Sequence, residues 1–400
     1  MGSDRERRLM KIMLVSNVYG ALARGGAERV VAEEAEALIA FGEDVVVVSG
    51  GRRTANGERY VQPAARSPQS APYYPPNIAF YTDLAKYGVV FRFFWHVFDI
   101  WNARSAKIFS SILRDARPDV VHTHNLMGLG FLIPHAIRRA GIRHVHTVHD
   151  VQLLDPSGLL RADRPLRLAW HQRAYVAIMR RQFGSPDVVI FPSAFHRDLH
   201  LQLGFFSKSR HVVLRNPTLS SCAPRALSAS PPRFLFAGQL EQHKGISVLL
   251  DAWEKKKFAG TLEIAGGGSL ESDVRHRIET MRDVRMLGRL DRVALDAAYD
   301  RTDWIVIPSV AIENAPATLM EAFGRGIPAV ASATGGIPEL VRDGVTGFLA
   351  APGDAAVLSE ALARAAKSGA SYAAFSSQAV AAVVGLDAPT HAKKLLELYF

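Results

Sequence analysis

Two glutamates in the stretch IENAPATLMEA are placed to bind a ligand at the end of a helix. Glu313 follows a buried, strand-like run, and Glu321 lies inside the helical pattern that comes next. Pro316 suits the first turn of that helix, so the unpaired amide of Ala317 should point out of its end. Helix-end amides bind phosphate, and carboxylates accept hydrogen bonds from the two hydroxyls of a diol. The pair therefore favours a nucleoside diphosphate sugar as ligand, although the helix dipole alone would explain a single glutamate there.

Two further segments that follow strands carry residues that could bind an anion. Gly25 and Gly26 precede a helix that begins near Ala27, and glycines let backbone amides approach a phosphate closely. In the second half, Lys244 precedes a glycine at another expected helix start, where its ammonium could stand over an anion. A tight turn and a solvated lysine are the ordinary explanations of these two features. The glycine pair lacks the G-x-G-x-x-G spacing of a dinucleotide site.

Both halves of the chain alternate strand-like and helical segments, which predicts an α/β fold with parallel sheets covered on both faces. Two Rossmann-like, doubly wound domains facing a cleft are the simplest architecture. Ligands bind beyond the carboxyl ends of such strands, which is where the glutamates, glycines and lysine lie. The predicted strands are residues 11–17, 44–50, 119–124, 143–150 and 187–193 in the first half, and RFLFAGQ, TLEIAGGG, VRMLGR, DWIVIPS and PAVASA in the second.

A segment rich in Pro, Ser and Ala separates the two halves and lacks any apolar period. It is typical of a linker and is predicted to cover residues 216–232. We therefore expect a first domain over residues 1–215, a second over 233–385, and a last helix over 386–400. Residues 50–77 are too long and too rich in proline for an ordinary connection, so they are predicted to be a functional loop over the cleft or a disordered segment.

The composition is that of a globular protein with two domains or more, since 48% of the 400 residues are hydrophobic. The single cysteine, Cys222, permits neither an internal disulfide nor a zinc site made of cysteines, which favours a cytoplasmic protein. A charged stretch at the start passes directly into a short strand-like run, so no signal peptide is expected.

Positive charge is concentrated in the first half of the chain. Residues 1–215 hold 29 Lys and Arg against 18 Asp and Glu, whereas the remainder holds 19 against 20. This excess favours an anionic partner, such as an acidic membrane leaflet or a phosphorylated substrate, unless it is simply a solvated basic surface. Nucleic acid is the least favoured partner, because no recognised binding motif accompanies the charge.

An aromatic stretch at residues 88–103 is interrupted by Arg92, His96 and Asp99, so it cannot span a bilayer. The simpler interpretation is an amphipathic helix packed on a sheet. The alternative is a helix that lies on the membrane surface. Together with the basic first half, this alternative would suit a peripheral protein of the inner membrane surface.

Taken together, these features resemble the family 4 retaining glycosyltransferases of GT-B architecture. The similar segments are GGAERVV, PDVVHTHN and TVHD in the first half, and GQLEQHKG, the E-x7-E pair of glutamates and GIPAVASATGGIPELVRDGVTGFL in the second. The resemblance implies that the first domain binds the acceptor and the second the donor, and that the last helix crosses back to the first domain. It implies no cofactor and no metal, and the chain contains no Asp-x-Asp motif.

The resemblance also implies roles for the residues that match the family's motifs. Glu321 should hold the ribose of the donor, Glu313 should contact the donor sugar, and His149 should lie beside the reacting sugar. Lys244 should neutralise the leaving diphosphate. The expected catalytic residues are thus His149, Lys244 and Glu313, and the expected donor-binding residues are Gly25, Gly26, Gln239, Lys244, Leu287, Arg289, Asn314, Ala317, Thr318 and Glu321.

One position departs from the family pattern. Members usually have an arginine five residues before the lysine, and that position is Gln239 here. A neutral hydrogen bond contributes about 1 kcal/mol, against roughly 1.5 to 3 kcal/mol for a charge-assisted one, so the diphosphate should be stabilised less. Either Arg289 or Arg24 compensates, or the enzyme is slow or uses an unusual donor.

The expected activity is retaining transfer of a hexose-type sugar from a nucleoside diphosphate sugar to a hydroxyl of a glycan or lipid-linked acceptor, in cell-surface polysaccharide biosynthesis. Two alternatives remain open. One is a catalytically inactive scaffold that binds sugar nucleotides, and the other is an epimerase or hydrolase with the same fold.

Overall fold

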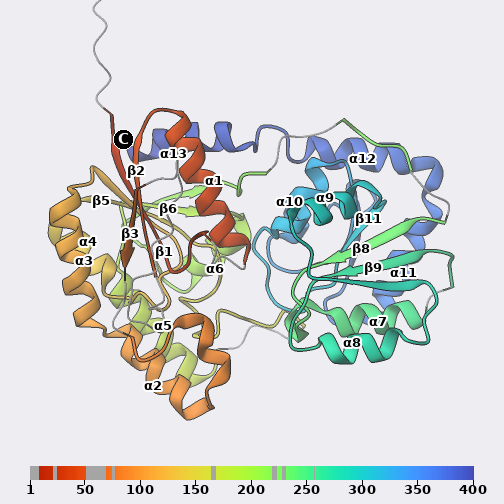
Figure 1. The fold of residues 1–400 in the computed structure, drawn as a ribbon, viewed down its shortest axis with the longest axis horizontal. Helices are drawn as coiled ribbons and strands as arrows, with labels where there is room; N and C mark the ends of the chain where they lie inside the picture. The colour runs from red at the N-terminus through yellow and green to blue at the C-terminus, as the bar shows by residue number, and fades with distance from the viewer. Residues whose placement is uncertain are drawn as a thin grey trace, which may run out of the picture.

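A computed structural model describes residues 9–20, 25–50, 69–73, 77–163, 168–218, 223–227, 231–255 and 257–400, with the backbone alone at 69–73, 82 and 85. Two domains lie side by side, and each is built on a parallel sheet covered by helices (Figure 1). Buried apolar clusters lie on both faces of each sheet, as the alternation of strands and helices predicts.

The first sheet has seven strands in the order β3-β2-β1-β4-β5-β6-β7, all paired in parallel. The strand order reverses between β1 and β4, and ligands bind at such a switch point in doubly wound sheets. Short β-branched runs buried on both faces make the central strands. The strands are β1 (Lys11–Ser16), β2 (Asp44–Gly50), β3 (Gln69–Tyr73), β4 (Val120–Thr123), β5 (Arg143–Thr147), β6 (Val188–Phe191) and β7 (Arg210–Val213).

The second sheet has six parallel strands in the order β10-β9-β8-β11-β12-β13 and repeats the same topology. Its strand order reverses between β8 and β11, so both sheets have a switch point. The strands are β8 (Arg233–Ala237), β9 (Thr261–Ala265), β10 (Val284–Gly288), β11 (Trp304–Ile307), β12 (Ala329–Ser332) and β13 (Gly347–Ala350).

Helices connect the strands in both domains. The first domain holds α1 (Gly26–Ala40), α2 (Val89–Ile100), α3 (Ala103–Ala116), α4 (Ile133–Ala140), α5 (Trp170–Phe183), α6 (Ala194–Gln202) and the 3-10 helix η2 (Tyr81–Lys86). The second holds α7 (Ile246–Glu254), α8 (Glu271–Ile278), α9 (Arg292–Asp300), α10 (Ala317–Gly324), α11 (Ala355–Lys367), α12 (Tyr372–Ala381) and three 3-10 helices, η3 (Gln242–Lys244), η4 (Ile337–Glu339) and η5 (Gly369–Ser371).

The final helix, α13 (Ala388–Tyr399), packs on the first domain although it follows the second in the chain. In Figure 1 it lies above the first sheet, beside α1. Its buried residues Leu395 and Leu396 share a cluster with Leu14 of β1 and Val47 of β2. The first domain is therefore built from both ends of the chain.

Residues 69–73 correct one prediction. They form strand β3, which pairs in parallel with β2 at the edge of the sheet, so the prediction of a loop or a disordered segment is wrong there. The sequence QSAPY contains no β-branched residue, and the pairing with β2 therefore outweighs local preference. Residues 51–68 and 74–76 of the same region lie outside the described residues.

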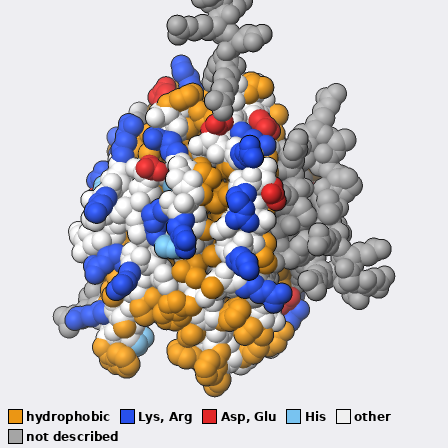
Figure 2. Space-filling view, turned by 90° about the vertical axis from the view of Figure 1, so that its left-hand side faces the viewer, with side chains coloured by type: hydrophobic (Ala, Val, Ile, Leu, Met, Phe, Trp, Pro, Cys, Tyr) orange, Lys and Arg blue, Asp and Glu red, His pale blue; other side chains and the backbone are white. Residues whose placement is uncertain are grey.

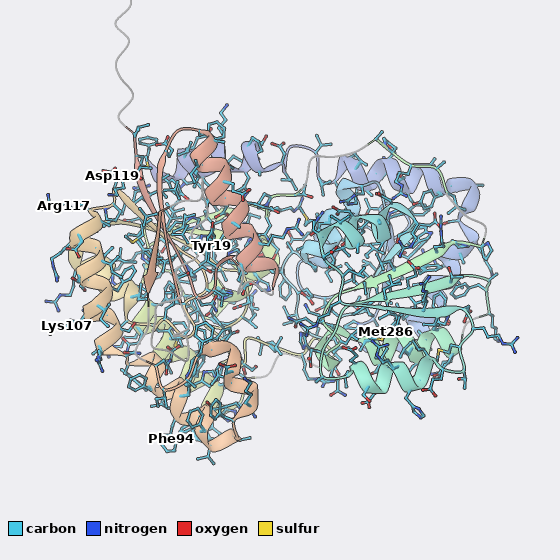
Figure 3. The ribbon with its side chains drawn as sticks, viewed as in Figure 1. Tyr19, Phe94, Lys107, Arg117, Asp119 and Met286 are labelled. Atoms are coloured by element: carbon cyan, nitrogen blue, oxygen red, sulfur yellow. The ribbon has the colours of Figure 1, made fainter. Side chains whose placement is uncertain are left out.

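The aromatic stretch forms helix α2 as predicted, but little of it packs on the domain. Only Trp95, Asp99 and Ile100 are buried, while the side chains of Val89 and Phe93 are 72% and 61% exposed. Phe94 points away from the lower end of the domain (Figure 3). The expectation of a helix packed on the sheet therefore holds for one face of α2 only.

Candidate active site

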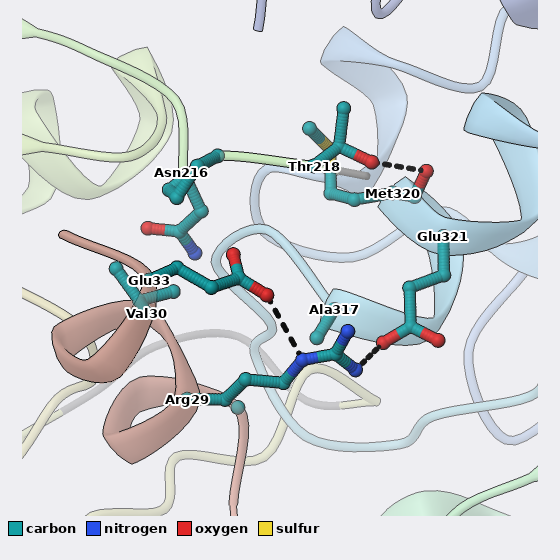
Figure 4. A pocket seen from close by; sticks show the side chains of 10 residues that line it. Arg29, Val30, Glu33, Asn216, Thr218, Ala317, Met320 and Glu321 are labelled. Carbon is teal, nitrogen blue, oxygen red and sulfur yellow. Dashed lines mark hydrogen bonds and ion pairs between the residues drawn. The ribbon is translucent and has the colours of Figure 1, made fainter. Parts of the chain in front are cut away.

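A pocket lies between the two domains, where the N-terminal ends of α1 and α10 meet (Figure 4). The two helix ends are close, since a Cβ atom placed on Gly26 would lie 3.2 Å from the Cβ of Ala317. Each end offers free amides and the positive end of a helix dipole, which together make an anion-binding place. The pocket is lined by Gly26, Arg29, Val30, Glu33, Asn216, Pro217, Thr218, Ala317, Met320 and Glu321.

Glu321 is held by two arginines that the sequence did not single out. Its side chain is buried, and Arg29 of α1 donates to Oε1 across the domain boundary. Arg292 of α9 donates to Oε2 at 3.3 Å, and Arg29 also donates to Glu33 at 3.0 Å. A ribose that binds both oxygens of Glu321 must share them with these guanidinium groups or displace one.

Lys244 and Glu313, both expected to be catalytic, are in direct contact. The Lys244 ammonium donates to Oε1 of Glu313 at 2.8 Å, and the Ser309 hydroxyl donates to the same oxygen at 2.7 Å. Burial alone would raise the pKa of Glu313, but the charge of Lys244 and these hydrogen bonds outweigh it, so the pKa lies below the ordinary value. Glu313 is therefore a carboxylate at neutral pH.

Three glycines fix the backbone around this ion pair. Gly245 has a φ of +75°, and a Cβ there would lie 1.8 Å from the carbonyl oxygen of Pro308, so no side chain fits. A Cβ on Gly335 would lie 1.8 Å from the carbonyl oxygen of Glu313, and the amide of Gly336 donates to that oxygen at 2.8 Å. The GG pair in the ATGG segment thus holds the backbone of Glu313 in place.

Replacing Gly335 with alanine should lower catalytic activity by at least about tenfold, because the added methyl group must displace Glu313. The matched control is Gly344→Ala. Gly344 also has a positive φ, +73°, but no atom lies within 4 Å of its added Cβ. The control should lose only about 1 to 2 kcal/mol of unfolding free energy through backbone strain. Activity assays and thermal unfolding of both variants check this, and equal loss of activity in the two would contradict it.

His149 follows β5 and is bound to both domains. Its Nε2 lies 2.9 Å from Nδ1 of His124, and burial lowers its pKa to about 3, so the ring is neutral at neutral pH. Asn314 of the second domain donates to the carbonyl oxygens of Val148 and His149 at 2.9 and 3.1 Å. The Asn314 side chain therefore positions the backbone of His149. Because its Oδ1 also accepts from the Ser193 hydroxyl at 2.7 Å, only the backbone of Asn314 is left to contact a ligand.

The other predicted donor residues lie at the ends of strands or helices. Leu287 and Arg289 lie at the carboxyl end of β10, where the amide of Gly266 donates to the carbonyl of Gly288 at 2.7 Å. Gln239 follows β8 and is exposed, and Arg289 is exposed beside Gly267. Gly25 lies at the N-terminal end of α1, and Thr318 lies at the N-terminal end of α10. Arg24 lies outside the described residues.

The structure therefore brings the predicted residues into two groups. Gly26, Ala317 and Glu321 line the pocket, whereas Lys244 and Glu313 form an ion pair. The main residues missed were Arg29, Arg292 and Ser309. Only Arg29 had a sequence signal, because it lies three residues after Gly26 and thus on the same side of the helix.

One cluster has the residue types of a metal site. Glu34, His122 and His124 place one ligand atom each within 4.8 Å of one another, and all three are buried. His122 already uses both ring nitrogens, since Nδ1 lies 2.8 Å from the Tyr399 hydroxyl and Nε2 lies 2.7 Å from the Thr147 hydroxyl. The ring nitrogens of His122 are thus both engaged by hydroxyl groups.

None of the helices in the described part of the chain has the length and hydrophobicity needed to cross a bilayer.

Two family descriptions match nearly all of the chain. Residues 25–217 match "Glycosyl transferase 4-like domain", and residues 223–381 match "Glycosyl transferases group 1". A Klebsiella pneumoniae protein, "Uncharacterized 42.6 kDa protein in cps region", is 28% identical over 344 residues, which cover 83% of this chain and 88% of that protein.

Two further similarities extend the comparison. The amylovoran biosynthesis glycosyltransferase AmsK of Erwinia amylovora is 34% identical over 145 residues, 34% of this chain and 36% of AmsK. The Anabaena protein HepE, solved in complex with UDP, shares the fold with a TM-score of 0.69 at 18% identity, over 97% of this chain and 99% of HepE. HepE has also been solved in complex with UDP-glucose.

Proposed function

Because the chain belongs to the GT-B glycosyltransferases, with a 4-like domain followed by a group 1 domain, we propose that it builds a cell-surface polysaccharide. The sugar is a hexose carried by a nucleoside diphosphate, and the acceptor is a hydroxyl of a glycan or lipid-linked saccharide. The name of AmsK and the cps region of the Klebsiella relative support this pathway class. The complexes of HepE make UDP-sugars the first donors to test.

The observation that carries the proposal is the meeting of two helix ends beside a buried carboxylate. Gly26 of α1 and Ala317 of α10 offer free amides to a diphosphate, and Glu321 lies one turn along α10. The ribose of a nucleoside diphosphate is attached to the phosphates, so one ligand can reach both groups. The 2.8 Å contact between Lys244 and Glu313 supplies a cation and a carboxylate for the sugar end of the same donor.

We propose transfer on one face of the sugar, with retention of configuration. The bond between the anomeric carbon and the diphosphate oxygen breaks, and its electron pair stays on the diphosphate. Lys244 and the helix amides are preorganised to stabilise that negative charge. The acceptor oxygen then bonds to the anomeric carbon from the same face, and its proton passes to the departing phosphate oxygen. His149 and Glu313 orient the sugar during this step.

No divalent cation takes part in this proposal, since the lysine and the amide groups already provide the positive charge that the diphosphate needs. Activity should therefore persist in a chelating buffer.

The test is nucleotide release from UDP-, GDP-, ADP- and dTDP-sugars, first without acceptor and then with polyprenyl-linked glycans. Release from one donor that rises with acceptor and disappears in Glu321→Ala would support the proposal, and NMR of the product would give its anomeric configuration. Nucleotide release at the same rate with and without acceptor would indicate a hydrolase. Binding of a donor without any release would indicate an inactive scaffold.

Helix α2 supports contact with a membrane surface. Its exposed side is apolar, and Arg92, Arg104 and Lys107 on α2 and α3 are also exposed. Hydrophobic side chains gather at the lower end of the first domain in Figure 2, with Lys and Arg side chains above them. We propose that this surface binds anionic phospholipid and brings the cleft to a lipid-linked acceptor.

Replacing Phe93 and Phe94 together with serine should weaken binding to vesicles that contain anionic phospholipid by at least about tenfold. The loss follows from the apolar area that the two exposed rings would bury in the bilayer. The matched control is Val293→Ser, because Val293 is 79% exposed on α9 of the second domain. Cosedimentation measures binding, and equal binding by both variants would exclude α2 as the contact.

A further inference from the structure

A row of buried polar groups runs from His149 into the first domain. Nε2 of His149 lies 2.9 Å from Nδ1 of His124, and Nε2 of His124 lies 3.4 Å from Oε2 of Glu34. Oε1 of Glu34 lies 2.9 Å from Nε2 of His391. The row therefore links the segments after β5 and β4 to α1 and α13, and it ends at the residue expected to lie beside the reacting sugar.

The contact between Glu34 and His124, in the middle of the row, is longer than a standard hydrogen bond. Oε2 of Glu34 and Nε2 of His124 are both fully buried, and within the described chain neither has a hydrogen-bond partner at standard distance. They face one another at 3.4 Å, and a buried polar atom without a partner is costly. A proton shared between the two atoms in a hydrogen bond would give each of them a partner.

Glu34 is best placed as the acceptor. Two ring nitrogens, one from His391 and one from His124, face its two carboxylate oxygens. An ionised carboxylate can accept from both, whereas a protonated one would have to donate to one of them. The proton in the middle contact thus belongs to Nε2 of His124.

This assignment fixes the proton at each following position. Burial and neighbouring histidines hold the pKa of His124 well below its ordinary value, so its ring is neutral and carries one proton. With that proton on Nε2, Nδ1 of His124 is an acceptor, and Nε2 of His149 must donate to it. His149 is neutral as well, so its remaining nitrogen, Nδ1, has a free lone pair.

We propose that Glu34 and His124 are positioning residues that fix the tautomer of His149, so that Nδ1 of His149 accepts a hydrogen bond from a hydroxyl of the donor sugar. In the described chain, Nδ1 of His149 has no hydrogen-bond partner, and the ring is half-buried. The sugar contact rests on the proposed function, whereas the tautomer does not. Glu34 thereby acts on the site through two other side chains, without touching the substrate.

The test is long-range proton–nitrogen NMR of the full chain labelled with 15N-histidine, with His149→Gln to assign the signal. In the unaltered protein we expect the proton on Nε2 of His149. A proton on Nδ1, or a doubly protonated ring, would overturn the proposal. This measurement needs no donor and no turnover, so it separates failure of the tautomer assignment from failure of the proposed function.

The variant Glu34→Gln adds a second readout. Its amide can donate to Nε2 of His124, which moves one proton along the row and places it on Nδ1 of His149. We expect that tautomer in the spectrum, together with a fall in kcat/KM for the donor of about tenfold from the lost hydrogen bond. Glu36→Gln is the matched control, since Glu36 is exposed on the same helix. An unchanged His149 signal in a folded Glu34→Gln protein would overturn the proposal, and if that variant does not fold, the unaltered protein's spectrum decides.

Discussion

Replacing Lys244 with alanine should lower kcat by about 100- to 1,000-fold while the KM for the donor changes little. The Lys244 ammonium is held at 2.8 Å from Glu313 before any ligand arrives, so its position does not depend on the donor. In the proposed mechanism, negative charge on the diphosphate grows as the glycosidic bond breaks, so Lys244 should stabilise the transition state more than the bound donor. Steady-state kinetics with the donor identified by the release assay would measure both constants.

The control for this prediction is Lys255→Ala, because Lys255 is exposed at the end of α7, outside the pocket. It should behave as the unaltered enzyme. If Lys244→Ala instead raised the donor KM and left kcat unchanged, Lys244 would bind the diphosphate equally in the ground and transition states. That result would remove it from the catalytic residues.

Replacing Glu321 with alanine should raise the donor KM by about 10- to 100-fold with a smaller effect on kcat. In the proposed donor complex, Glu321 accepts hydrogen bonds from the ribose in both the bound state and the transition state, and the variant would lose them. The variant would also leave Arg29 and Arg292 without their shared partner. Isothermal titration with the nucleoside diphosphate gives the loss of affinity directly.

Glu360→Gln is the control for the loss of one negative charge. Glu360 is exposed on α11 and does not line the pocket, so the substitution leaves the N-terminal ends of α1 and α10 unchanged. Its donor KM should match that of the unaltered enzyme. If Glu321→Ala and Glu360→Gln bound the nucleotide with equal affinity, Glu321 would serve only to hold the two arginines.

Local sequence predicted where the candidate site residues lie when they are close together in the chain. Glu313 and Pro316 lie in the connection between β11 and α10, and Glu321 lies in α10, so strand and helix patterns place them without any long-range information. The GG pair of the ATGG segment was visible as part of a family segment, but its packing on Glu313 was not. That packing depends on a contact between loops that follow β11 and β12.

Contacts between distant segments could not be predicted in the same way. Arg29 reaches Glu321 across 292 positions of sequence, and the row behind His149 joins α1 to α13. The histidines of PDVVHTHN and TVHD were visible in the chain, but only the pairing of β4 with β5 shows which of them touch. The edge strand β3 was missed for a related reason, because its neighbour β2 and not its own sequence determines its conformation.

The place of α13 also affects the order in which the protein can be made and folded. The first domain leaves the ribosome early, but its cluster around Leu14 and Val47 stays uncovered until Leu395 and Leu396 have been synthesised. Domains usually fold as units during synthesis, N-terminal first. Here the second domain can fold before the first is complete, so a nascent chain would expose the apolar cluster of the first domain until α13 has emerged. Loss of those residues should then cause aggregation of the first domain, with the second domain still folded.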